Sequence, residues 1–216
     1  FKQSFVNGCQ RENADDWTKY GDPWSHRRDK LAVKVKFADQ TVNCVPYDMP
    51  VIGYETTTVG TLRLWQCEAE EELNFDAFNA QDYVKALEKK NKAEDITRVL
   101  YPNDSTWEGK RLRGKQQYVL SSASLQDILR DYRQQHGTDY YRLPEFIAVQ
   151  LNDTHPAMSI PELIRLLMAE GLDFDAAFEL TRRVFAYTNH TVMTEALEKW
   201  DLELLRSVVP EVCEII

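Results

Sequence analysis

The sequence predicts an α/β fold in which a mainly parallel sheet is flanked by helices. Two apolar runs with strand character, 146–151 and 184–188, are separated by helical material, which is the arrangement of parallel strands joined by a crossover. Residues 1–70 are strand-rich, and residues 71–216 form a helix-rich α/β part that contains these two runs. We therefore expect residues 1–216 to form a single partial domain.

The strand-rich part is predicted from alternation and from its turn residues. Val33, Val35 and Phe37 alternate with lysines, which is the period of a half-buried strand. The run 61-TLRLWQC-67 is a second strand candidate. The segment 44-CVPYDMPVIGY-54 carries two prolines and a glycine, so we expect a structured loop or an edge strand there.

Helices are predicted from residue 75 onward. The segment 75–91 has apolar residues near helical spacing, and 93–104 indicates a short helix that runs into a polar turn. A longer helix is predicted around 125–132, where leucine, isoleucine and tyrosine recur at i, i+3, i+4 and i+7. Gly137 is placed to end this helix in a left-handed conformation.

Three further helices follow along the chain. Ser159 and Glu162 have the spacing of a capping box, which predicts a helix that starts at Ser159. A second helix is expected from about Asp173, and a last one over 195–209.

Polar side chains follow both candidate parallel strands. Asp153 and His155 come directly after the first strand, and His190 follows the second. Because parallel strands joined by a crossover end at the same edge of a sheet, where ligands of open α/β sheets bind, these three side chains are predicted to converge on one crevice. Two alternatives stay open: ordinary loop and cap residues, or a metal site of two histidines and a carboxylate.

A third polar cluster, 99-VLYPNDSTWEGKRLRGKQQY-118, lies between two predicted helices. Its Tyr101 and Trp107 have rings suited to stacking on a flat ligand or a sugar. The alternative is a helix–loop–helix connection whose aromatic rings pack underneath it.

Composition narrows the class of partner. The chain has 26 basic and 35 acidic residues and a net charge of −9, so nucleic acid is not an expected partner. No apolar run approaches the roughly 20 residues needed to cross a bilayer, so no membrane partner is expected. The 4 cysteines include no Cys-x-x-Cys pair, which favours free thiols in a reducing cytoplasm. The lack of an initiator methionine or secretory leader at Phe1 and the apolar end Ile215-Ile216 suggest a fragment of a longer protein.

Several long motifs carry a family likeness. In these segments the sequence resembles the α-glucan phosphorylases, meaning glycogen, starch and maltodextrin phosphorylase, and the motifs are 45-VPYDMPVIGY-54, 61-TLRLW-65, 99-VLYPND-104, 124-SLQDILR-130, 149-VQLNDTHPAMSIPELIRLL-167, 186-AYTNHTVMTEALEKW-200 and 214-EII-216. The resemblance implies part of the N-terminal Rossmann-like domain of a glycosyltransferase-B fold, without its extreme N-terminus and without the C-terminal cofactor domain. It also implies a homodimeric enzyme.

The implied reaction is phosphorolysis of terminal α-1,4-linked glucosyl units by inorganic phosphate, which gives α-glucose-1-phosphate. Pyridoxal 5′-phosphate would assist through its phosphate group, and its lysine would lie beyond Ile216. The catalytic set is thus expected to be incomplete, and residues 1–216 alone are expected to be inactive. A non-catalytic carbohydrate-binding α/β domain and a metal-dependent hydrolase are the alternative functions.

The matching motifs also imply roles for individual residues. His190 corresponds to a histidine that hydrogen-bonds the reacting glucosyl unit, Asp153 and His155 to polar wall residues near the sugars, and Glu195 to a residue bordering the inner pocket. The segment 101–108 corresponds to a mobile gate loop, with Asp104 and Ser105 toward the substrate and with Tyr101, Asn103, Trp107 and Glu108 in the same loop.

Three positions depart from the family pattern. Ser105 stands where many members carry asparagine, and Thr194 replaces a usual proline. Asp131 occupies the second place of an arginine pair that binds the phosphate of AMP in animal members, so we expect no AMP activation of that kind. The stretch between Phe37 and Cys44 is shorter than in animal members, which suggests a bacterial-type enzyme.

Overall fold

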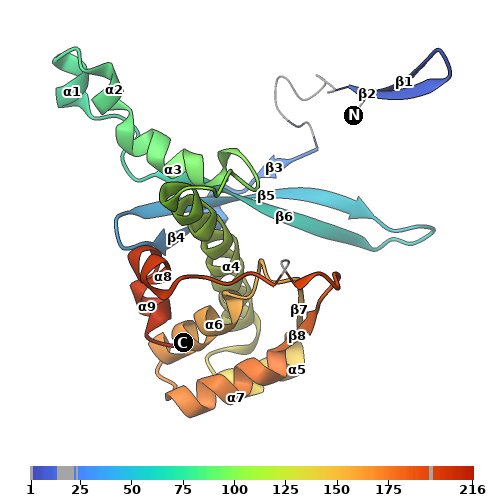
Figure 1. Cartoon of the computed structure of the whole chain (residues 1–216). Helices are drawn as coiled ribbons and strands as arrows, with labels where there is room; N and C mark the ends of the chain where they lie inside the picture. Colours follow the sequence, from blue (N-terminus) through green and yellow to red (C-terminus); the bar gives the residue numbers. More distant parts are fainter. Residues whose placement is uncertain (1, 14–21, 23, 195–196) are drawn as a thin grey trace.

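The structure, a computed structural model, describes residues 2–13, 22, 24–194 and 197–216. Its strands are β1 (Lys2–Val6), β2 (Cys9–Asn13), β3 (His26–Arg27), β4 (Val33–Lys36), β5 (Thr41–Ile52), β6 (Val59–Ala69), β7 (Val149–Asn152) and β8 (Phe185–Thr188). Its α-helices are α1 (Phe75–Asn79), α2 (Tyr83–Ala86), α3 (Glu88–Arg98), α4 (Trp107–His136), α5 (Leu143–Phe146), α6 (Ser159–Ala169), α7 (Phe174–Val184), α8 (Leu202–Val208) and α9 (Pro210–Cys213). Figure 1 shows these elements in a mixed α/β arrangement.

Antiparallel pairing dominates the described strands, so the expected mainly parallel sheet is not what these residues form. β1 pairs with β2, and β5 pairs with β3, β4 and β6, all of them antiparallel. Strands joined by short turns fold back on each other, whereas a parallel pair needs a long crossover. Helices α6 and α7 supply that crossover between β7 and β8, whose predicted parallel pairing is confirmed.

Strand β5 is the central strand of its sheet, so the prediction of a loop or edge strand over 44–54 was wrong. Both prolines of β5 nevertheless lie outside the β3 pairs, so they disturb the ladder little. The carbonyl of Pro46 accepts from the amide of Arg28, the residue after β3, so only the reciprocal bond from position 46 is missing there. Pro50 is four residues further along and so faces the same side of β5. It lies beyond the last pair with β3, His26 with Asp48, where no strand pairs with that side of β5 among the described residues.

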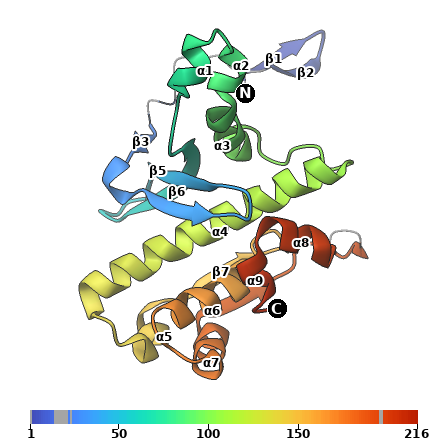
Figure 2. The same ribbon diagram turned by 90° about the vertical axis from the view of Figure 1, so that its left-hand side faces the viewer.

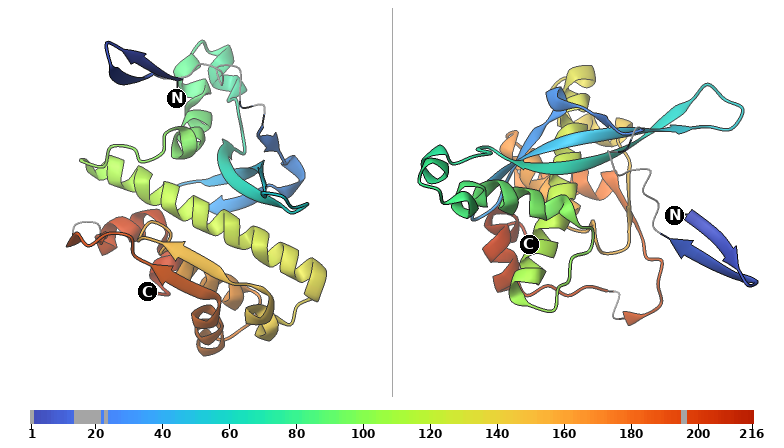
Figure 3. Two further views of the ribbon diagram at one scale, coloured as in Figure 1. Left: turned by 90° about the vertical axis from the view of Figure 1, so that its right-hand side faces the viewer. Right: turned by 90° about the horizontal axis from the view of Figure 1, so that it is seen from above.

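Helix α4 lies at the centre of the molecule. It runs between the β3–β6 sheet on one side and β7, β8 and α6 on the other (Figures 1 and 2), and Figure 3 shows the same layers from two further sides. Residues 114–119 are all buried. A helix covered on both sides shows no single apolar stripe, which is why the sequence predicted a helix only around 125–132 and a loop over much of 99–118.

Polar side chains of α4 are satisfied by partners from the two layers. Tyr118 and Ser122 donate to the buried carboxylate of Glu162 on α6, over 2.9 and 2.7 Å. Lys115 reaches Asp39, in the turn between β4 and β5, over 2.7 Å. These bonds offset the cost of burying polar groups and set the rotation of the helix between the layers.

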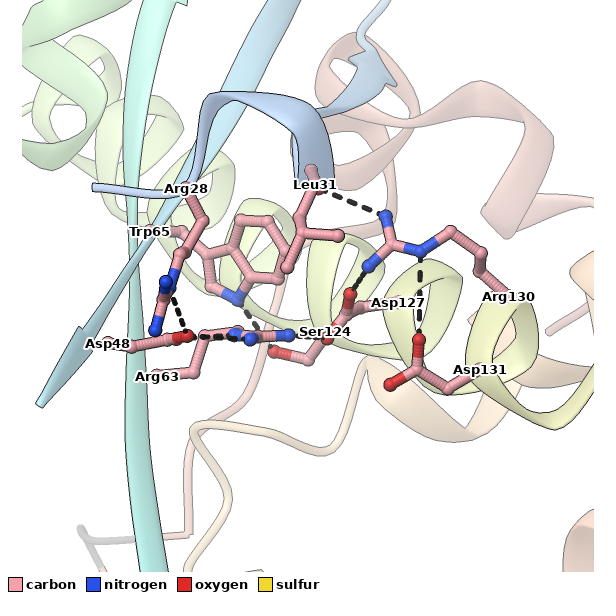
Figure 4. A network of polar contacts seen from close by, with 9 residues as sticks. All are labelled: Arg28, Leu31, Asp48, Arg63, Trp65, Ser124, Asp127, Arg130 and Asp131. Carbon is pink, nitrogen blue, oxygen red and sulfur yellow. Dashed lines mark hydrogen bonds and ion pairs between the residues drawn. The ribbon is translucent and has the colours of Figure 1, made fainter. Parts of the chain in front are cut away.

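A charged network joins α4 to the sheet (Figure 4). Arg63 on β6 holds Asp48 on β5 through Nε–Oδ1 and Nη2–Oδ2 contacts of 2.6 and 2.8 Å, and it also pairs with Asp127 on α4. Arg28 adds a contact of 3.1 Å to Asp48, and Arg130 pairs with Asp127. The hydrogen bonds from Arg63 hold the pKa of Asp48 below its usual range.

Several local predictions are settled by the helices. The predicted helix over 75–91 is broken after Asn79 and divided among α1, α2 and the start of α3. Helix α7 begins where expected, with Asp173 as its cap through a bond from the Ala176 amide, and Gly137 ends α4 at φ +76° as predicted. The last predicted helix is shorter than expected, since α8 begins at Leu202.

The predicted capping box at the start of α6 was wrong. Met158 is the N-cap residue and makes no side-chain cap bond, and Ser159 lies inside the first turn. Glu162 is drawn instead into the core, where partners from α4 outcompete the free amides of its own helix.

Two apolar cores flank α4. The first lies between α4, the β4–β6 sheet, α3, α8 and α9, with Val42, Ile96, Val119 and Val208 fully buried. The second lies between the end of α4, α5, α6 and α7 and is centred on Leu167. Within the described ranges, no helix is both long enough and apolar enough to cross a membrane.

Candidate functional site

The ends of β7 and β8 meet as the sequence predicted. Asn152 and Thr188 are register partners, so the segments that carry His155 and His190 leave the sheet at one edge. Asp153 follows in the left-handed region at φ +60°, and its amide donates to the carbonyl of Thr188 over 2.9 Å.

The two strand ends are tied to each other by side chains. The carboxylate of Asp153 accepts from the backbone amide of His190 over 2.8 Å. The Nε2 atom of His190 lies 3.2 Å from Oδ1 of Asn152, which can only accept, so the proton belongs on Nε2. The other ring nitrogen of this exposed side chain, Nδ1, is then left to bond a ligand hydroxyl.

A short loop over residues 99–106 faces these strand ends. Its start is organised by Gln116 of α4, whose side chain accepts from the Tyr101 amide and donates to the carbonyls of Ile96 and Val99, over 2.9 to 3.0 Å. Tyr101 itself adopts φ +54°. The Oδ1 atom of Asn103 accepts from the amide and hydroxyl of Ser105, which closes a local turn.

The expected gate loop is therefore shorter than 101–108. Thr106 caps α4 by accepting from the Gly109 amide over 3.1 Å, so Trp107 and Glu108 lie in the first helical turn. The cap residue was not recognised because Asn103, Asp104, Ser105 and Gly109 made the segment look like a loop. Glu195 lies outside the described residues.

Arg113 of α4 links the loop to the strand ends. It contacts Asp104 over 3.0 Å, pairs with Glu198, and stands 5.8 Å from the ring centre of Tyr101. The Tyr101 ring lies 5.3 Å, centre to centre, from the imidazole of His155. The loop and the strand ends thus form one contiguous cluster.

Glu198 is the second hub of this cluster, and sequence reasoning missed it. Its carboxylate accepts from the side chains of Arg113, Gln117 and Thr154. Gln117 and Arg113 are four residues apart on α4, a spacing that places both on one helix face, but nothing in the sequence says which acid they meet.

A cavity of about 290 Å³ opens beneath the loop. Its walls are mainly apolar, and they are formed by Leu100, Tyr101, Gln116, Gln117, Leu120, Ser121, Ser124, Leu125, Ile128, Val149, Gln150, Leu151, His155, Pro156 and Ser159. The Oε1 atom of Gln117 is buried and has no hydrogen-bond partner among the described residues. His155 gives the cavity a hydrogen-bonding group for a hydroxylated ligand.

The alternative of a metal site at the strand ends finds no set of ligands in the described residues. In the described part of the chain, no three His, Cys, Asp or Glu side chains are grouped so that they could hold a metal ion. Asp153, one of the three expected ligands, holds the His190 amide instead.

Gly109 provides a test of how tightly the loop is seated on α4. A Cβ at this position would lie 2.2 Å from the carbonyl oxygen of Asn103, which is backbone and cannot move without moving the loop. We expect Gly109→Ala to lower the free energy of unfolding by about 1–3 kcal/mol in urea titrations, although alanine is favoured over glycine in helices by about 1 kcal/mol.

Gly114 is the matched control on the same helix. A Cβ there would meet the Trp200 ring at 3.5 Å, an ordinary contact, so Gly114→Ala should leave stability unchanged or slightly raised. Equal losses in the two variants would contradict the close seating of the loop.

Comparison with known proteins adds the family context. A sequence model of the carbohydrate phosphorylases matches residues 1–216. The chain is 44% identical over 238 residues to the brain and liver forms of glycogen phosphorylase from Homo sapiens, and 42% identical to the muscle form from Oryctolagus cuniculus. Each alignment covers 100% of this chain but only 28% of the relative.

Proposed function

The chain belongs to the carbohydrate phosphorylase family, and from this we propose that it is part of a glucan phosphorylase. The intact protein would transfer terminal α-1,4-linked glucosyl units to inorganic phosphate and release α-glucose-1-phosphate. Residues 1–216 would be a partial N-terminal domain that forms one wall of the active site. A non-catalytic carbohydrate-binding domain is the second candidate, because aromatic and polar groups at a strand edge suit sugar binding without chemistry.

One observation carries the proposal: the polar ends of β7 and β8 are joined by the Asp153–His190 contact at the rim beside the loop 99–106. Sugar hydroxyls require directional donors and acceptors, which Nδ1 of His190 and the side chain of Asn152 supply at this rim. In our proposal His190 bonds a hydroxyl of the reacting glucosyl unit, while Asp153 holds the segment of His190 in place.

The loop 99–106 would act as the gate of the same site. The Tyr101 ring lies tilted against the His155 imidazole, Arg113 lies over the Tyr101 ring, and Asp104 is held by Arg113, so a sugar at the rim would meet aromatic and charged groups. Closure by such a loop excludes water, which would otherwise compete with phosphate for the developing oxocarbenium carbon. We propose that Ser105 and Glu195 also border the bound glucan.

The buried lysine of the described residues, Lys115, does not fit pyridoxal 5′-phosphate. A Schiff base needs a neutral lysine amine in a pocket, but the buried lysine Lys115 is paired with Asp39 over 2.7 Å. The cofactor, which supplies an acid–base phosphate group in this proposal, would therefore be held by protein outside residues 1–216. It follows that this chain alone should give no glucose-1-phosphate.

The remaining partners follow from the same proposal. We propose an α-1,4-glucan and inorganic phosphate as substrates, a homodimer as the assembly, and the cytoplasm as the compartment.

The role of His190 is tested by replacement in the intact protein. His190→Ala removes one hydrogen bond to the glucosyl unit and leaves its partner unpaired, which costs about 1–3 kcal/mol. We expect kcat/KM for phosphorolysis of a maltodextrin to fall by about tenfold to a hundredfold, measured as α-glucose-1-phosphate release.

His26→Ala is the control, since His26 is an exposed histidine of β3, in the β3–β6 sheet away from this rim. Equal activities of the two variants would refute the His190 assignment. An intact protein that binds maltodextrin but releases no α-glucose-1-phosphate would favour the non-catalytic candidate.

A second prediction concerns AMP. Arg130 is already engaged by Asp127 and by the carbonyl of Leu31 over 3.1 Å, and the carboxylate of Asp131 stands 3.7 Å from its Nε atom. A phosphate dianion there would meet an occupied guanidinium and a repelling carboxylate. We expect no rise in phosphorolysis when AMP is added to the intact protein, and activation would contradict this reading of Arg130 and Asp131.

A further inference from the structure

Two cysteines face each other inside the β3–β6 sheet. Cys44 of β5 and Cys67 of β6 are register partners, and their Sγ atoms lie 4.0 Å apart. Both side chains are fully buried in the core beneath α3 and α4. The site described above uses neither of them.

The backbone geometry of this pair suits a cross-link. The amide of Cys67 donates to Thr97 on α3, and Cys44 shares the parity of Pro46, so both backbones turn their hydrogen-bonding groups away from each other. Facing residues of this non-hydrogen-bonded type have Cα atoms about 4.5 Å apart, which lies at the short end of the disulfide range of about 4.4–6.8 Å. The sulfurs need only approach to about 2.05 Å, which side-chain rotation can supply.

We propose that Cys44 and Cys67 form an intramolecular disulfide site that closes when the protein meets a peroxide. One thiolate attacks the peroxide, which gives a sulfenic acid and hydroxide. The sulfur of the second cysteine then displaces the hydroxyl group and loses its own proton. The two thiols are oxidised by two electrons, and hydrogen peroxide is reduced to two molecules of water.

Burial controls when this reaction can occur. The sulfur contact with Cys67, followed by burial, raises the pKa of the Cys44 thiol well above its ordinary value, so the closed fold keeps it protonated and slow to react. Oxidation therefore proceeds through opening of α3 from the sheet, whereas the exposed Cys9 reacts without opening. Once one sulfur of the pair is oxidised, its neighbour resolves it before a second oxidant arrives.

The experiment uses the whole 216-residue chain with Cys9→Ser and Cys213→Ser, so that only the pair can react. The protein is exposed to hydrogen peroxide in sub-denaturing urea, unfolded in iodoacetamide, digested without reductant and analysed by mass spectrometry. We expect one cross-linked peptide pair that contains Cys44 and Cys67, reversed by dithiothreitol. We also expect a melting temperature raised by about 5 °C or more.

The further variant Cys67→Ser is the matched control. It retains Cys44 in the same environment, and it should show sulfenic or sulfinic acid at Cys44 with no cross-link. Two results would overturn the proposal. In the first, both cysteines of the Cys9→Ser, Cys213→Ser protein are over-oxidised separately without a cross-link. In the second, neither cysteine reacts at urea concentrations where the Cys67 amide exchanges with deuterium. If the serine variants do not fold, the same experiment is done on the unaltered chain. A cross-linked Cys44–Cys67 peptide then supports the proposal, and cross-links to Cys9 or Cys213 refute it.

Discussion

Replacing Glu162 by leucine is expected to lower the free energy of unfolding by about 3–5 kcal/mol. The Glu162 carboxylate is fully buried, and both oxygens are occupied: Oε2 by Tyr118 and by Nε of Arg165, and Oε1 by Ser122 and by Nη2 of Arg165, all between 2.7 and 2.9 Å. Leucine would remove the acceptor and leave two hydroxyls and a guanidinium in the core without it. The cost of unpaired buried groups therefore dominates over the gain in apolar volume.

Glu162→Gln is the matched control. It keeps the shape and one acceptor oxygen but removes the charge, so we expect a smaller loss, of about 1–2 kcal/mol. Glu211 lies 3.5 Å from the other side of Arg165 and is half exposed, so Glu211→Gln should change stability little. Urea titrations of the three variants measure these differences. If Glu162→Leu lost less free energy of unfolding than Glu211→Gln, the role of Glu162 would be contradicted.

Replacing Arg63 by methionine is expected to cost about 2–3 kcal/mol at pH 7. The guanidinium holds the buried carboxylates of Asp48 and Asp127 on two different elements. After its removal, Asp127 would still be paired with Arg130, and Asp48 would still be paired with the half-exposed Arg28. The expected loss of unfolding free energy is at the low end of the range for a buried ion pair, because the Arg63 side chain is about a quarter exposed.

The pH dependence of this loss identifies its cause. The pKa of Asp48 is lowered in the folded protein, chiefly by hydrogen bonds from Arg63, relative to an ordinary value of 3.8. Its contribution to stability is therefore present above pH 3.8 and is lost as the pH falls through the lower folded pKa. The stability difference between the parent and Arg63→Met should be constant near neutrality and shrink below pH 3.8.

Arg27→Met is the control for this variant. Arg27 is also a sheet arginine that pairs with two carboxylates, Asp29 and Glu68, but its network lies on the surface. Exposed pairs contribute about 0–1 kcal/mol, so unfolding of Arg27→Met should show a small change. A comparable loss in both variants, or a loss in Arg63→Met that persists at low pH, would argue against charge pairing as the cause.

Elements with local determinants were predictable from the sequence. The alternation of Val33 and Val35 with lysines reports one buried and one exposed face, and β4 has that pattern. Asp173 and Gly137 act through bonds to their own neighbours, so their roles at helix ends do not depend on the rest of the fold. The parallel pairing of β7 and β8 followed from the helices between them, and with it the meeting of the polar strand ends.

The β3–β6 sheet depended on information that the sequence does not display. Prolines in 44–54 argued for an edge, but only the position of β3 shows that both prolines lie just outside its pairs with β5. Equally, Glu162 looked like a capping residue because its partners on α4 are remote in sequence.

The sequence by itself determined the family, the strand that leads to Asp153 and His155, its parallel partner that leads to His190, and the helix ends set by single residues. The tertiary structure alone decided that α4 is one buried helix and that Glu198 and Arg113 connect the loop to the strand ends. The physical reason is distance along the chain. A cap or an alternating strand is stabilised by neighbours within a few residues, whereas a buried polar group is tolerated only when a partner from another element reaches it.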